Sequence, residues 1–455
     1  MQSNYNIETP ACAKRALAIL EAAGFEAWLV GGFVRDALMG RKTHDIDMAV
    51  SCTWQETKAI FEAAGMQVYE TGAEHGTVTV MINGYAIEMT TYRTEGIYSD
   101  GRHPDSVAQA ATIEEDLARR DFTMNAIAYH PARGLIDPYG GRADIDAKLI
   151  RTVGTAAERF CEDALRILRA CRFASQLGFS IEEKTLQAAK ASKTMLIHIA
   201  KERMTRELEG LLLGEYVHDA LMETSLILTY TMPEIAGMVG FDQRSPYHQY
   251  DVFEHSAYAV QNTPAYPLVR WAAFLHDSGK PAAFFTTDGQ GHFYGHARLS
   301  ITIAGDILNR LAFPARFIDE VLTLIKFHDT RIEATPRGVK QALRYLDGNV
   351  EVFRALCELQ RADALSKAER YQSQAQHAEL LLAVLDEVLA TNAVFSRKKL
   401  AIDGHNVMAL GVEPGPRVGA LLDAALDAVI DERVANTREE LLAYLRGILD
   451  EARDE

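Results

Sequence analysis

The stretch from residue 29 to residue 50 constrains this chain more than any other segment. A short apolar run ends in a glycine pair, a helical pattern that opens with Arg35 and Asp36 follows, and Asp45 and Asp47 then alternate with apolar residues. Alternation with period two predicts a strand that carries both carboxylates on one face. Two neighbouring carboxylates repel each other unless a cation lies between them, and Mg²⁺ suits such oxygen ligands.

The glycine pair predicts a phosphate-binding helix start. Gly31 and Gly32 leave backbone N–H groups bare at a helix N-terminus, so a phosphate can approach closely. Arg35 adds a fork-shaped donor for phosphate oxygens. A Gly-Gly turn or an Asp-x-Asp pair alone is common by chance, but their order and spacing here are specific. Together they indicate a site for a nucleoside triphosphate and a metal.

Short strands and helices alternate around this stretch. Helical patterns over residues 11–23 and 54–64 end at glycines, and strand patterns cover residues 27–30, 46–50, 76–82 and 85–91. Asn83-Gly84 between the last two strands is a hairpin signal. We therefore expect an α/β head of roughly 140 residues. From Ile113 onward the pattern is overwhelmingly helical.

The bulk properties exclude several classes of protein. A chain of 455 residues is too long for one ordinary core, and no apolar run approaches the length of a membrane span. The first twenty residues lack a signal-peptide pattern, and the five scattered cysteines predict reduced thiols in the cytoplasm. A net charge of −16 argues against indiscriminate nucleic-acid binding, although a local basic stripe can still hold RNA.

A second charged motif precedes an apolar helical stripe. Arg119, Arg120 and Asp121 are consecutive, and Asn125 follows one helical turn later. For Arg119 a solvated charge cluster is an equally good interpretation.

A third motif places charges at every third position between residues 163 and 172. Its members are Asp163, Arg166, Arg169 and Arg172. On one helix they would form a slanting stripe, with Ile167, Leu168 and Cys171 on the opposite face toward the core. The ordinary interpretation of such a stripe is a solvated face. Three arginines in register would repel, however, unless a polyanion lies along them.

Asp163 and Arg166 can also distinguish bases. A carboxylate accepts from an exocyclic amine while a guanidinium donates to the neighbouring ring nitrogen, an order that cytosine and adenine both present. Uracil and guanine present an oxygen beside an N–H, so unmade hydrogen bonds would reject them by several kcal/mol.

Histidines and aspartates recur in the second half of the chain. The set consists of His255, His276, Asp277, His296, His328 and Asp363. Imidazoles combined with carboxylates suit a transition-metal site.

These motifs resemble known families. The stretch 29–50 resembles the signature of the nucleotidyltransferase superfamily, in the branch that holds tRNA CCA-adding enzymes and bacterial poly(A) polymerases. In that branch an Arg-Arg-Asp-x-x-x-Asn element contacts the triphosphate and ribose of the nucleotide, and Arg120, Asp121 and Asn125 match it. Glu162, Asp163 and Arg166 match the Glu-Asp-x-x-Arg motif of CCA-adding enzymes, which implies protein-templated selection of CTP and ATP.

The histidine and aspartate order resembles the HD-domain phosphohydrolases, although a structural HD body without turnover is an alternative. The resemblance implies an α/β nucleotidyltransferase head followed by an all-α neck, an HD body and a helical tail. The expected boundaries are a head at 1–145, a neck with the base-selecting template at 146–235, an HD domain at 236–370 and an RNA-binding tail at 371–455. Basic residues are few in the tail, which weakens the expectation of a tRNA footprint there.

We therefore expect a Mg²⁺-dependent enzyme that adds CCA to the 3′ end of tRNA from CTP and ATP, without a nucleic-acid template. The catalytic and magnesium-binding residues would be Asp45 and Asp47. The nucleotide-binding residues would be Gly32, Arg35, Arg120, Asp121, Asn125, Asp163, Arg166, Arg169 and Arg172. A second, transition metal in the HD domain would be held by His255, His276, Asp277, His296, His328 and Asp363. Glu88 is either a third carboxylate or an exposed strand residue.

The polar segment 92–107 predicts a mobile loop beside the site that controls the switch from C to A addition. Three alternatives stay open: a poly(A) polymerase, a CC-adding or A-adding specialist, and an HD phosphohydrolase with a vestigial head. We expect a cytoplasmic protein with no membrane or DNA partner.

Overall fold

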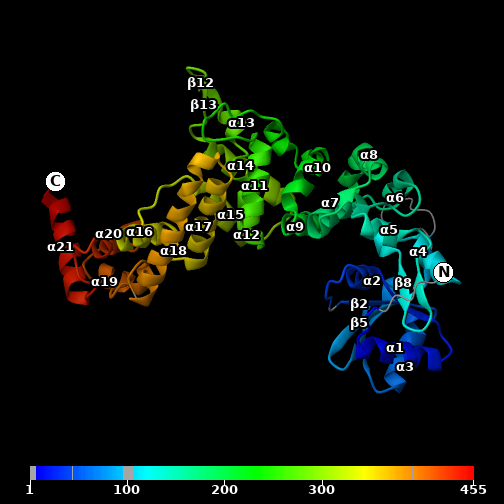
Figure 1. Ribbon diagram of the computed structural model, residues 1–455. Helices are drawn as coiled ribbons and strands as arrows, with labels where there is room; N and C mark the ends of the chain where they lie inside the picture. The colour runs from blue at the N-terminus through cyan, green and yellow to red at the C-terminus, as the bar shows by residue number, and fades with distance from the viewer. Residues whose placement is uncertain (1–6, 44, 96–106, 392, 455) are drawn as a thin grey trace. The chain divides into compact units, whose positions relative to one another are not determined.

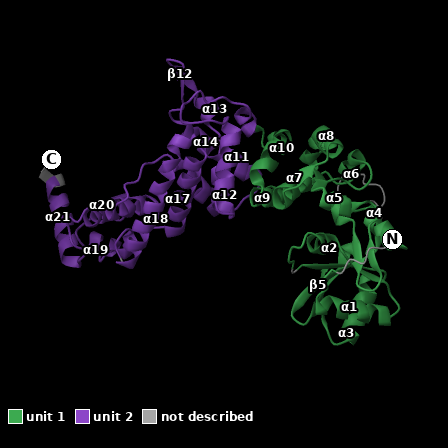
Figure 2. Cartoon of the chain, viewed as in Figure 1, with its two compact units in different colours: residues 1–233 green, residues 234–455 purple. Residues whose placement is uncertain are grey.

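The chain divides into two compact units, residues 1–233 and 234–455 (Figure 2). A computed structural model describes residues 7–43, 45–95, 107–391 and 393–454. In these described parts, no helix is both long and apolar enough to cross a bilayer. The finer division into four domains stays a prediction.

A mixed seven-stranded sheet with the order β3-β4-β5-β2-β1-β8-β9 lies in the first unit (Figure 1). Only its central pair, β2 and β5, is parallel. The strands are β1 Ala27–Val30, β2 Ile46–Val50, β3 Gln67–Gly72, β4 Thr77–Ile82, β5 Tyr85–Thr91, β8 Ala128–His130 and β9 Gly134–Ile136. The α/β head predicted from the alternating patterns is therefore confirmed, but β8 and β9 lie beyond Ile113, where the pattern predicted helices, and that part of the prediction is wrong.

Ten α-helices are described in the first unit. They are α1 Ala11–Ala22, α2 Gly31–Leu38, α3 Trp54–Ala63, α4 Ile113–Ala118, α5 Gly141–Asp146, α6 Ala156–Glu162, α7 Leu165–Leu177, α8 Glu183–Ser192, α9 Lys201–Leu212 and α10 Val217–Thr231. The hairpin between β4 and β5 turns at Asn83 and Gly84, which have φ of 54° and 83°. Left-handed backbone at both positions is the geometry that an Asn-Gly turn supplies.

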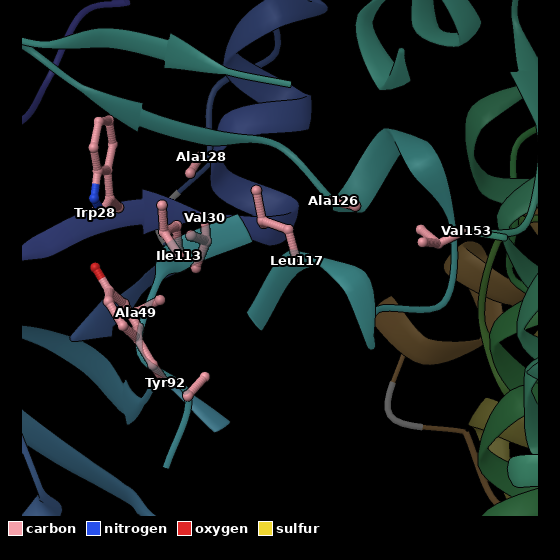
Figure 3. Packing of buried hydrophobic residues seen from close by; sticks show 10 residues of the cluster. Trp28, Val30, Ala49, Tyr92, Ile113, Leu117, Ala126, Ala128 and Val153 are labelled. Atoms are coloured by element: carbon pink, nitrogen blue, oxygen red, sulfur yellow. The ribbon is translucent and has the colours of Figure 1, made fainter. Parts of the chain in front are cut away.

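A buried cluster packs the sheet against α4 (Figure 3). Trp28 and Val30 come from β1, while Ile113 and Leu117 lie on one face of α4. Tyr92 is fully buried in the same cluster, directly after β5. This packing holds α4 against the strands β1, β2 and β8 of the sheet.

The second unit is largely helical. Its helices are α11 Val252–Asn262, α12 Pro267–Leu275, α13 Lys280–Ala283, α14 His296–Arg310, α15 Ala315–Phe327, α16 Pro336–Tyr345, α17 Val350–Leu365, α18 Ala375–Ala390, α19 Gly404–Met408, α20 Pro416–Ile430 and α21 Arg438–Asp454. Helices α11, α12 and α15 pack around α17.

The prediction of purely helical structure after the head is wrong at two places. β10 Leu149–Ile150 pairs in parallel with β11 Ser180–Ile181, and β12 Phe285–Thr287 forms a hairpin with β13 Gln290–His292. Asp288 and Gly289 adopt left-handed φ at the hairpin turn. Asp-Gly is a hairpin signal, which the prediction of an all-α HD body overlooked.

The predicted loop 92–107 is only partly described, because residues 96–106 lie outside the described residues. At its two ends the backbone is regular: β6 Arg93–Glu95 pairs antiparallel with β7 Val107–Gln109. The expectation of irregular structure is therefore wrong at both ends.

Candidate active site

A cavity of about 760 Å³ in the first unit gathers most of the residues singled out in the sequence. Those that line it are Gly31, Gly32, Arg35, Asp47, Glu88, Arg120, Asp121, Asn125, Asp163, Arg166 and Arg169. Asp45 and Arg172 do not appear among the described lining residues. The lining also includes His75, Thr77, Thr90, Arg93, Phe173 and Arg203, which the sequence analysis did not select.

The acidic residues lie where β2 and β5 run side by side. β2 begins at Ile46, so Asp45 precedes the strand and is exposed, whereas Asp47 is half-buried within it. Glu88 on β5 is the register partner of Asp47. Glu88 is an exposed strand residue, and it also lines the cavity beside Asp47. Its exposure on the strand is therefore compatible with a role as a third carboxylate.

Crowding of negative charge makes Asp47 hard to ionise. Burial and the neighbouring Glu88, helped by Asp45, raise the pKa of Asp47 to about 6, although Arg120 and Arg35 act in the opposite direction. A buried carboxylate whose pKa is raised by neighbouring carboxylates favours a bound cation, because the charge of the cation removes the repulsion. The donor set therefore fits a divalent metal.

The two glycines form the first turn of α2, so this helix begins four residues before Arg35 rather than at it. Gly31 has a left-handed φ of 65°. A Cβ atom there would lie 3.1 Å from Arg120 Nη1 and 3.4 Å from Asp47 Oδ2. The missing side chain lets the helix start approach both the acidic strand and the guanidinium.

A buried hydrogen-bond chain crosses the cavity floor. Arg35 Nη1 donates to Asn125 Oδ1 over 2.9 Å, and Asn125 Nδ2 donates to Asp121 Oδ1 over 3.0 Å. Arg169 donates from Nε and Nη2 to Asp121 Oδ2, at 2.8 and 2.7 Å. Burial alone would raise the pKa of Asp121, but Arg169 and Asn125 outweigh it and lower the pKa to about 2. Asp121 is therefore a fixed anion that joins α2 to α7.

Arg119 and Arg120 share the buried carboxylate of Asp116. Arg119 donates to Asp116 Oδ1 at 2.8 Å from Nη2, and Arg120 donates to Oδ2 at 3.1 Å. The interpretation of Arg119 as a solvated charge is therefore wrong. Its backbone carbonyl also accepts from Arg166 Nη2 at 3.0 Å, so α4 and α7 are linked.

The stripe predicted over residues 163–172 is not continuous. Asp163 ends α6 in extended conformation with a φ of −142°, and α7 begins two residues later. Arg203 Nη2 donates to Asp163 Oδ2 over 2.9 Å. Asp163 is therefore held between two helices and not one helical turn before Arg166.

Each arginine of α7 has a carboxylate partner from outside the helix. Arg166 pairs with Glu162 at 2.5 Å, Arg169 with Asp121 at 2.7 Å, and Arg172 with Glu207 at 2.6 Å. The argument that these arginines need a polyanion to relieve their repulsion is therefore wrong, because the fold supplies the acids. Ile167 and Leu168 on the other face are buried, as predicted.

Phe173 supports three of these guanidinium groups. The Cζ atoms of Arg35 and Arg169 lie 5.3 Å from its ring centroid, and that of Arg172 lies 4.4 Å away. Such cation–π contacts hold the planar groups in place. Phe173 was not predicted as a site residue. The sequence signal that could have identified it is its position on the same helix, directly after Arg172.

The predicted histidines and aspartates of the second unit converge. Two groups of three residues have candidate ligand atoms that all lie within 4.8 Å of one another inside the group. The first group is His255, His276 and Asp277, and the second is Asp277, His296 and His328. Asp277 belongs to both groups. His255 Nε2 also lies 3.0 Å from Asp363 Oδ1. The six sequence-predicted residues therefore form one buried cluster that could bind metal.

Backbone carbonyls orient the imidazoles of this cluster. The Nδ1 atoms of His276, His296 and His328 lie 2.7–3.0 Å from carbonyls three residues earlier. Donation from Nδ1 leaves the Nε2 lone pairs for a ligand, which is the usual arrangement of metal-binding histidines. Two lysines also reach the carboxylates: Lys280 Nζ lies 2.6 Å from Asp277 and Lys367 Nζ 2.6 Å from Asp363.

The raised pKa of Asp47 generates a stability prediction. The unfolded chain ionises Asp47 near its ordinary value of 3.8, and the folded chain only near 6, so the ionised carboxylate costs folding free energy above about pH 6. In metal-free buffer at pH 8, Asp47→Asn should raise the unfolding midpoint by on the order of 2–4 °C. The gain should shrink as the pH falls toward 4.

Thermal melts across this pH range test the prediction, with the exposed Asp45→Asn as the matched control and little change expected from it. Addition of Mg²⁺ should stabilise the wild type more than Asp47→Asn, since only the wild type keeps the full acidic set. If Asp47→Asn has the same unfolding midpoint as the wild type at pH 8, both with and without Mg²⁺, the account is contradicted.

Three family models match separate parts of the chain. Residues 27–151 match the poly A polymerase head domain, residues 178–238 a probable RNA and SrmB-binding site of polymerase A, and residues 296–445 a putative tRNA nucleotidyltransferase domain 2. The first match covers the glycine pair, the acidic strand and the Arg-Arg-Asp motif.

Full-length relatives agree with these models. A CCA-adding enzyme from Geobacillus thermodenitrificans is 38% identical, with 94% of each chain covered. One from Streptococcus thermophilus is 34% identical over 96% of this chain and 98% of its own length. The crystal structure of the Bacillus stearothermophilus CCA-adding enzyme in complex with CTP has a TM-score of 0.73 at 29% identity, covering 97% and 98% of the two chains.

A more distant structure shares the fold. The Thermotoga maritima CCA-adding enzyme complexed with tRNA_CCA has a TM-score of 0.59 at 20% identity and covers 97% of each chain. The chain belongs to the CCA-adding enzyme family of tRNA nucleotidyltransferases.

Proposed function

We propose that the cavity of the first unit is where this CCA-adding enzyme joins nucleotides from CTP and ATP to the 3′ end of tRNA. One observation carries the proposal: a single cavity contains the Asp47–Glu88 pair, the glycine helix start and the Asp163–Arg166 pair. Solved structures of CCA-adding enzymes with a similar fold include complexes with CTP, with ATP and with tRNA_CCA.

Asp45, Asp47 and Glu88 would hold Mg²⁺. When bound, the metal lowers the pKa of the RNA 3′-hydroxyl and neutralises charge on the phosphates. Glu88 is the register partner of Asp47, and Asp45 contributes to the raised pKa of Asp47, so all three carboxylates act on the same space. Asp45 would be the outermost of the three, because Asp47 and Glu88 line the cavity and Asp45 is not among its described lining residues.

The triphosphate would lie beside these carboxylates, against the start of α2. Backbone N–H groups at Gly31 and Gly32 point outward from a helix N-terminus, and Arg120 reaches toward the same position. Arg35 and Asn125 share a hydrogen bond beside it, where the ribose of the nucleotide would lie.

Transfer then follows the usual phosphoryl chemistry. The RNA 3′-oxygen loses its proton and forms a bond to the α-phosphorus, while the bond to the β-phosphate oxygen breaks and pyrophosphate leaves. The chain contributes mainly position and charge: arginines opposite the phosphates, and carboxylates beside the attacking oxygen.

Asp163 and Arg166 would select the base. Both side chains are held by hydrogen bonds within the protein. Asp163 accepts a hydrogen bond from Arg203. Arg166 donates to the carboxylate of Glu162 and to the backbone carbonyls of Arg119 and Arg159. Fixed groups can reject uracil and guanine because they cannot rotate to satisfy a wrong edge.

Arg166→Ala should therefore change selectivity more than rate. Loss of one charged hydrogen bond to the base costs on the order of 1.5–3 kcal/mol, or roughly ten- to a hundredfold in the ratio of kcat/KM for CTP over UTP. Arg172→Ala is the matched control, since Arg172 pairs with Glu207 and Gln176 outside the cavity lining. This variant should leave the ratio unchanged. The same ratio in wild type and Arg166→Ala would place base selection elsewhere.

The alternative of a vestigial head is disfavoured by the intact acidic pair and template. A poly(A) polymerase and a CC-adding or A-adding specialist would use the same cavity, but the full-length relatives are CCA-adding enzymes.

We also propose the division at 145, 235 and 370 into head, neck, HD body and tail, and a cytoplasmic location.

A second activity is proposed for the histidine cluster of the second unit. Its order and its convergence fit an HD-type phosphohydrolase that holds a transition metal. In such hydrolysis water bonds to phosphorus, the ester P–O bond breaks, and an alcohol and a phosphate are released. Burial lowers the pKa of His276, but Asp277 and Asp363 outweigh it and raise the pKa to about 10. A metal would compete with that proton.

The double variant His276→Ala, Asp277→Ala should lose hydrolysis of p-nitrophenyl phosphate and of 2′,3′-cyclic nucleotides, assayed with Mg²⁺, Mn²⁺, Ni²⁺ and Co²⁺. Nucleotide addition to tRNA should continue, because the cavity proposed for it lies in the first unit. His377→Ala is the control, because His377 lies in the same unit and bonds a backbone carbonyl outside the cluster. A wild type inactive with all four metals would make the cluster structural.

A further inference from the structure

A buried carboxylate holds two arginines at the wall of the cavity in the first unit. Asp116 is 1% exposed and lies on α4 between Ile113 and Leu117, whose side chains fix that helix in the apolar cluster (Figure 3). Its Oδ1 accepts from Arg119 Nε at 3.0 Å and Nη2 at 2.8 Å, and its Oδ2 accepts from Arg120 Nη2 at 3.1 Å. Burial alone would raise the pKa of Asp116, but Arg120 and Arg119 outweigh it and lower the pKa. Asp116 is therefore ionised in the folded protein.

A further contact ties this carboxylate to a neighbouring strand. The backbone N–H of Arg93, the first residue of β6, donates to Asp116 Oδ1 over 3.3 Å. β6 pairs with β7, and α4 follows β7 along the chain. Asp116 is thus held by β6 as well as by the two arginines, so its carboxylate cannot shift without breaking contacts on both sides.

One end of the Arg120 guanidinium is anchored, and the other is directed into the cavity. Nη2 is bonded to Asp116, whereas Nη1 lies 3.1 Å from the position that a Cβ of Gly31 would take. Nε of Arg120 is buried and has no hydrogen-bond partner within the described parts of the chain. A buried N–H without an acceptor is costly, so it favours an acceptor supplied by a ligand. Phosphate oxygens at the start of α2 would be such acceptors.

Asp47 competes for the same guanidinium. Its Oδ2 lies 3.4 Å from the same position at Gly31. Burial and Glu88 raise the pKa of Asp47, and Arg120 is the charge that most strongly opposes them. An Arg120 side chain released from Asp116 would be free to pair with Asp47 and would then oppose the binding of a cation there.

We propose that Asp116 is a positioning residue that makes the site select a triphosphate and keeps the acidic pair open for Mg²⁺. It acts through Arg120: with Nη2 held at Asp116, Nε and Nη1 remain for phosphate oxygens. Since the α-phosphate reacts at the carboxylates, the β- and γ-phosphates are those that reach Arg120. Asp116 itself does not appear among the described residues that line the cavity. The inference rests on the proposed nucleotide-transfer function and concerns how the same site recognises its substrate.

Binding of CTP and CMP, measured by calorimetry with Mg²⁺ and without tRNA, tests the triphosphate contact. Asp116→Asn keeps the shape of the side chain and removes its charge. It should weaken CTP binding roughly ten- to a hundredfold, as expected for the loss of one charged hydrogen bond, and leave CMP binding unchanged. The Mg²⁺ concentration for half-maximal nucleotide addition should rise in the same variant. An unchanged ratio of the two dissociation constants, or equal losses for CTP and CMP, would overturn the inference.

A double-mutant cycle tests whether Asp116 acts through Arg120. Arg120→Ala should weaken CTP binding, and Asp116→Asn combined with it should cause no further loss. A second loss of full size in the double variant would mean that Asp116 acts by another route, and the inference would be overturned.

Asp144→Asn is the matched control. Asp144 is also buried in the first unit and pairs with Arg151 at 3.1 Å, but it is not among the described lining residues of the cavity. Its variant should lower the unfolding midpoint and leave the ratio of the two dissociation constants unchanged. If Asp116→Asn does not fold, Asp116→Glu takes its place, because it retains the anion and moves it by one methylene. The displaced Arg120 should again lower the preference for CTP over CMP, and an unchanged preference would contradict the inference.

The wild type distinguishes failure of the inference from failure of the proposed function. If the wild type binds CTP no more tightly than CMP and adds no nucleotide to tRNA, the proposed function fails and the inference fails with it. If the wild type prefers CTP and adds nucleotides, but Asp116→Asn keeps that preference, only the role of Asp116 is overturned.

Discussion

The buried anion of Asp121 is the interaction on which the active-site geometry depends. Its two oxygens accept from Asn125 and from Arg169, and Asn125 in turn fixes Arg35. One carboxylate therefore sets the positions of α2, which would face the triphosphate, and of α7, which would face the base. Removal of Arg169 leaves the buried charge of Asp121 without its counter-ion, which is far more costly than the loss of a surface ion pair.

Charge is compensated differently in the two sites. In the first unit, carboxylates from elsewhere in the fold neutralise the arginines, whereas Asp47 and Glu88 face each other on adjacent strands. Arg120 and Arg35 only partly offset the repulsion at Asp47, so this pair favours a bound cation. In the second unit, lysines reach Asp277 and Asp363 at 2.6 Å, so a metal there would compete with internal ammonium groups.

Local patterns predicted the head well and its long-range pairings poorly. β1, β2 and β5 have the predicted bounds because alternation and flanking glycines define them. The carboxylate partners of the α7 arginines come from distant positions such as Asp121 and Glu207, which periodicity cannot reveal. The break between α6 and α7 at Asp163 was not predicted for a related reason, since the spacing of charged residues alone cannot distinguish one helix from two. The proposed roles of the site residues still rest on resemblance and geometry.

The most direct test of the central claim is the sequence of the product made from a tRNA transcript that lacks its 3′ CCA. Wild-type protein, Mg²⁺ and all four nucleoside triphosphates are supplied without any nucleic-acid template, and the extended 3′ ends are sequenced. The account predicts that C, C and A are added in that order and that addition then stops. A run of A residues, addition that ends after a single kind of nucleotide, or incorporation of U and G would contradict it.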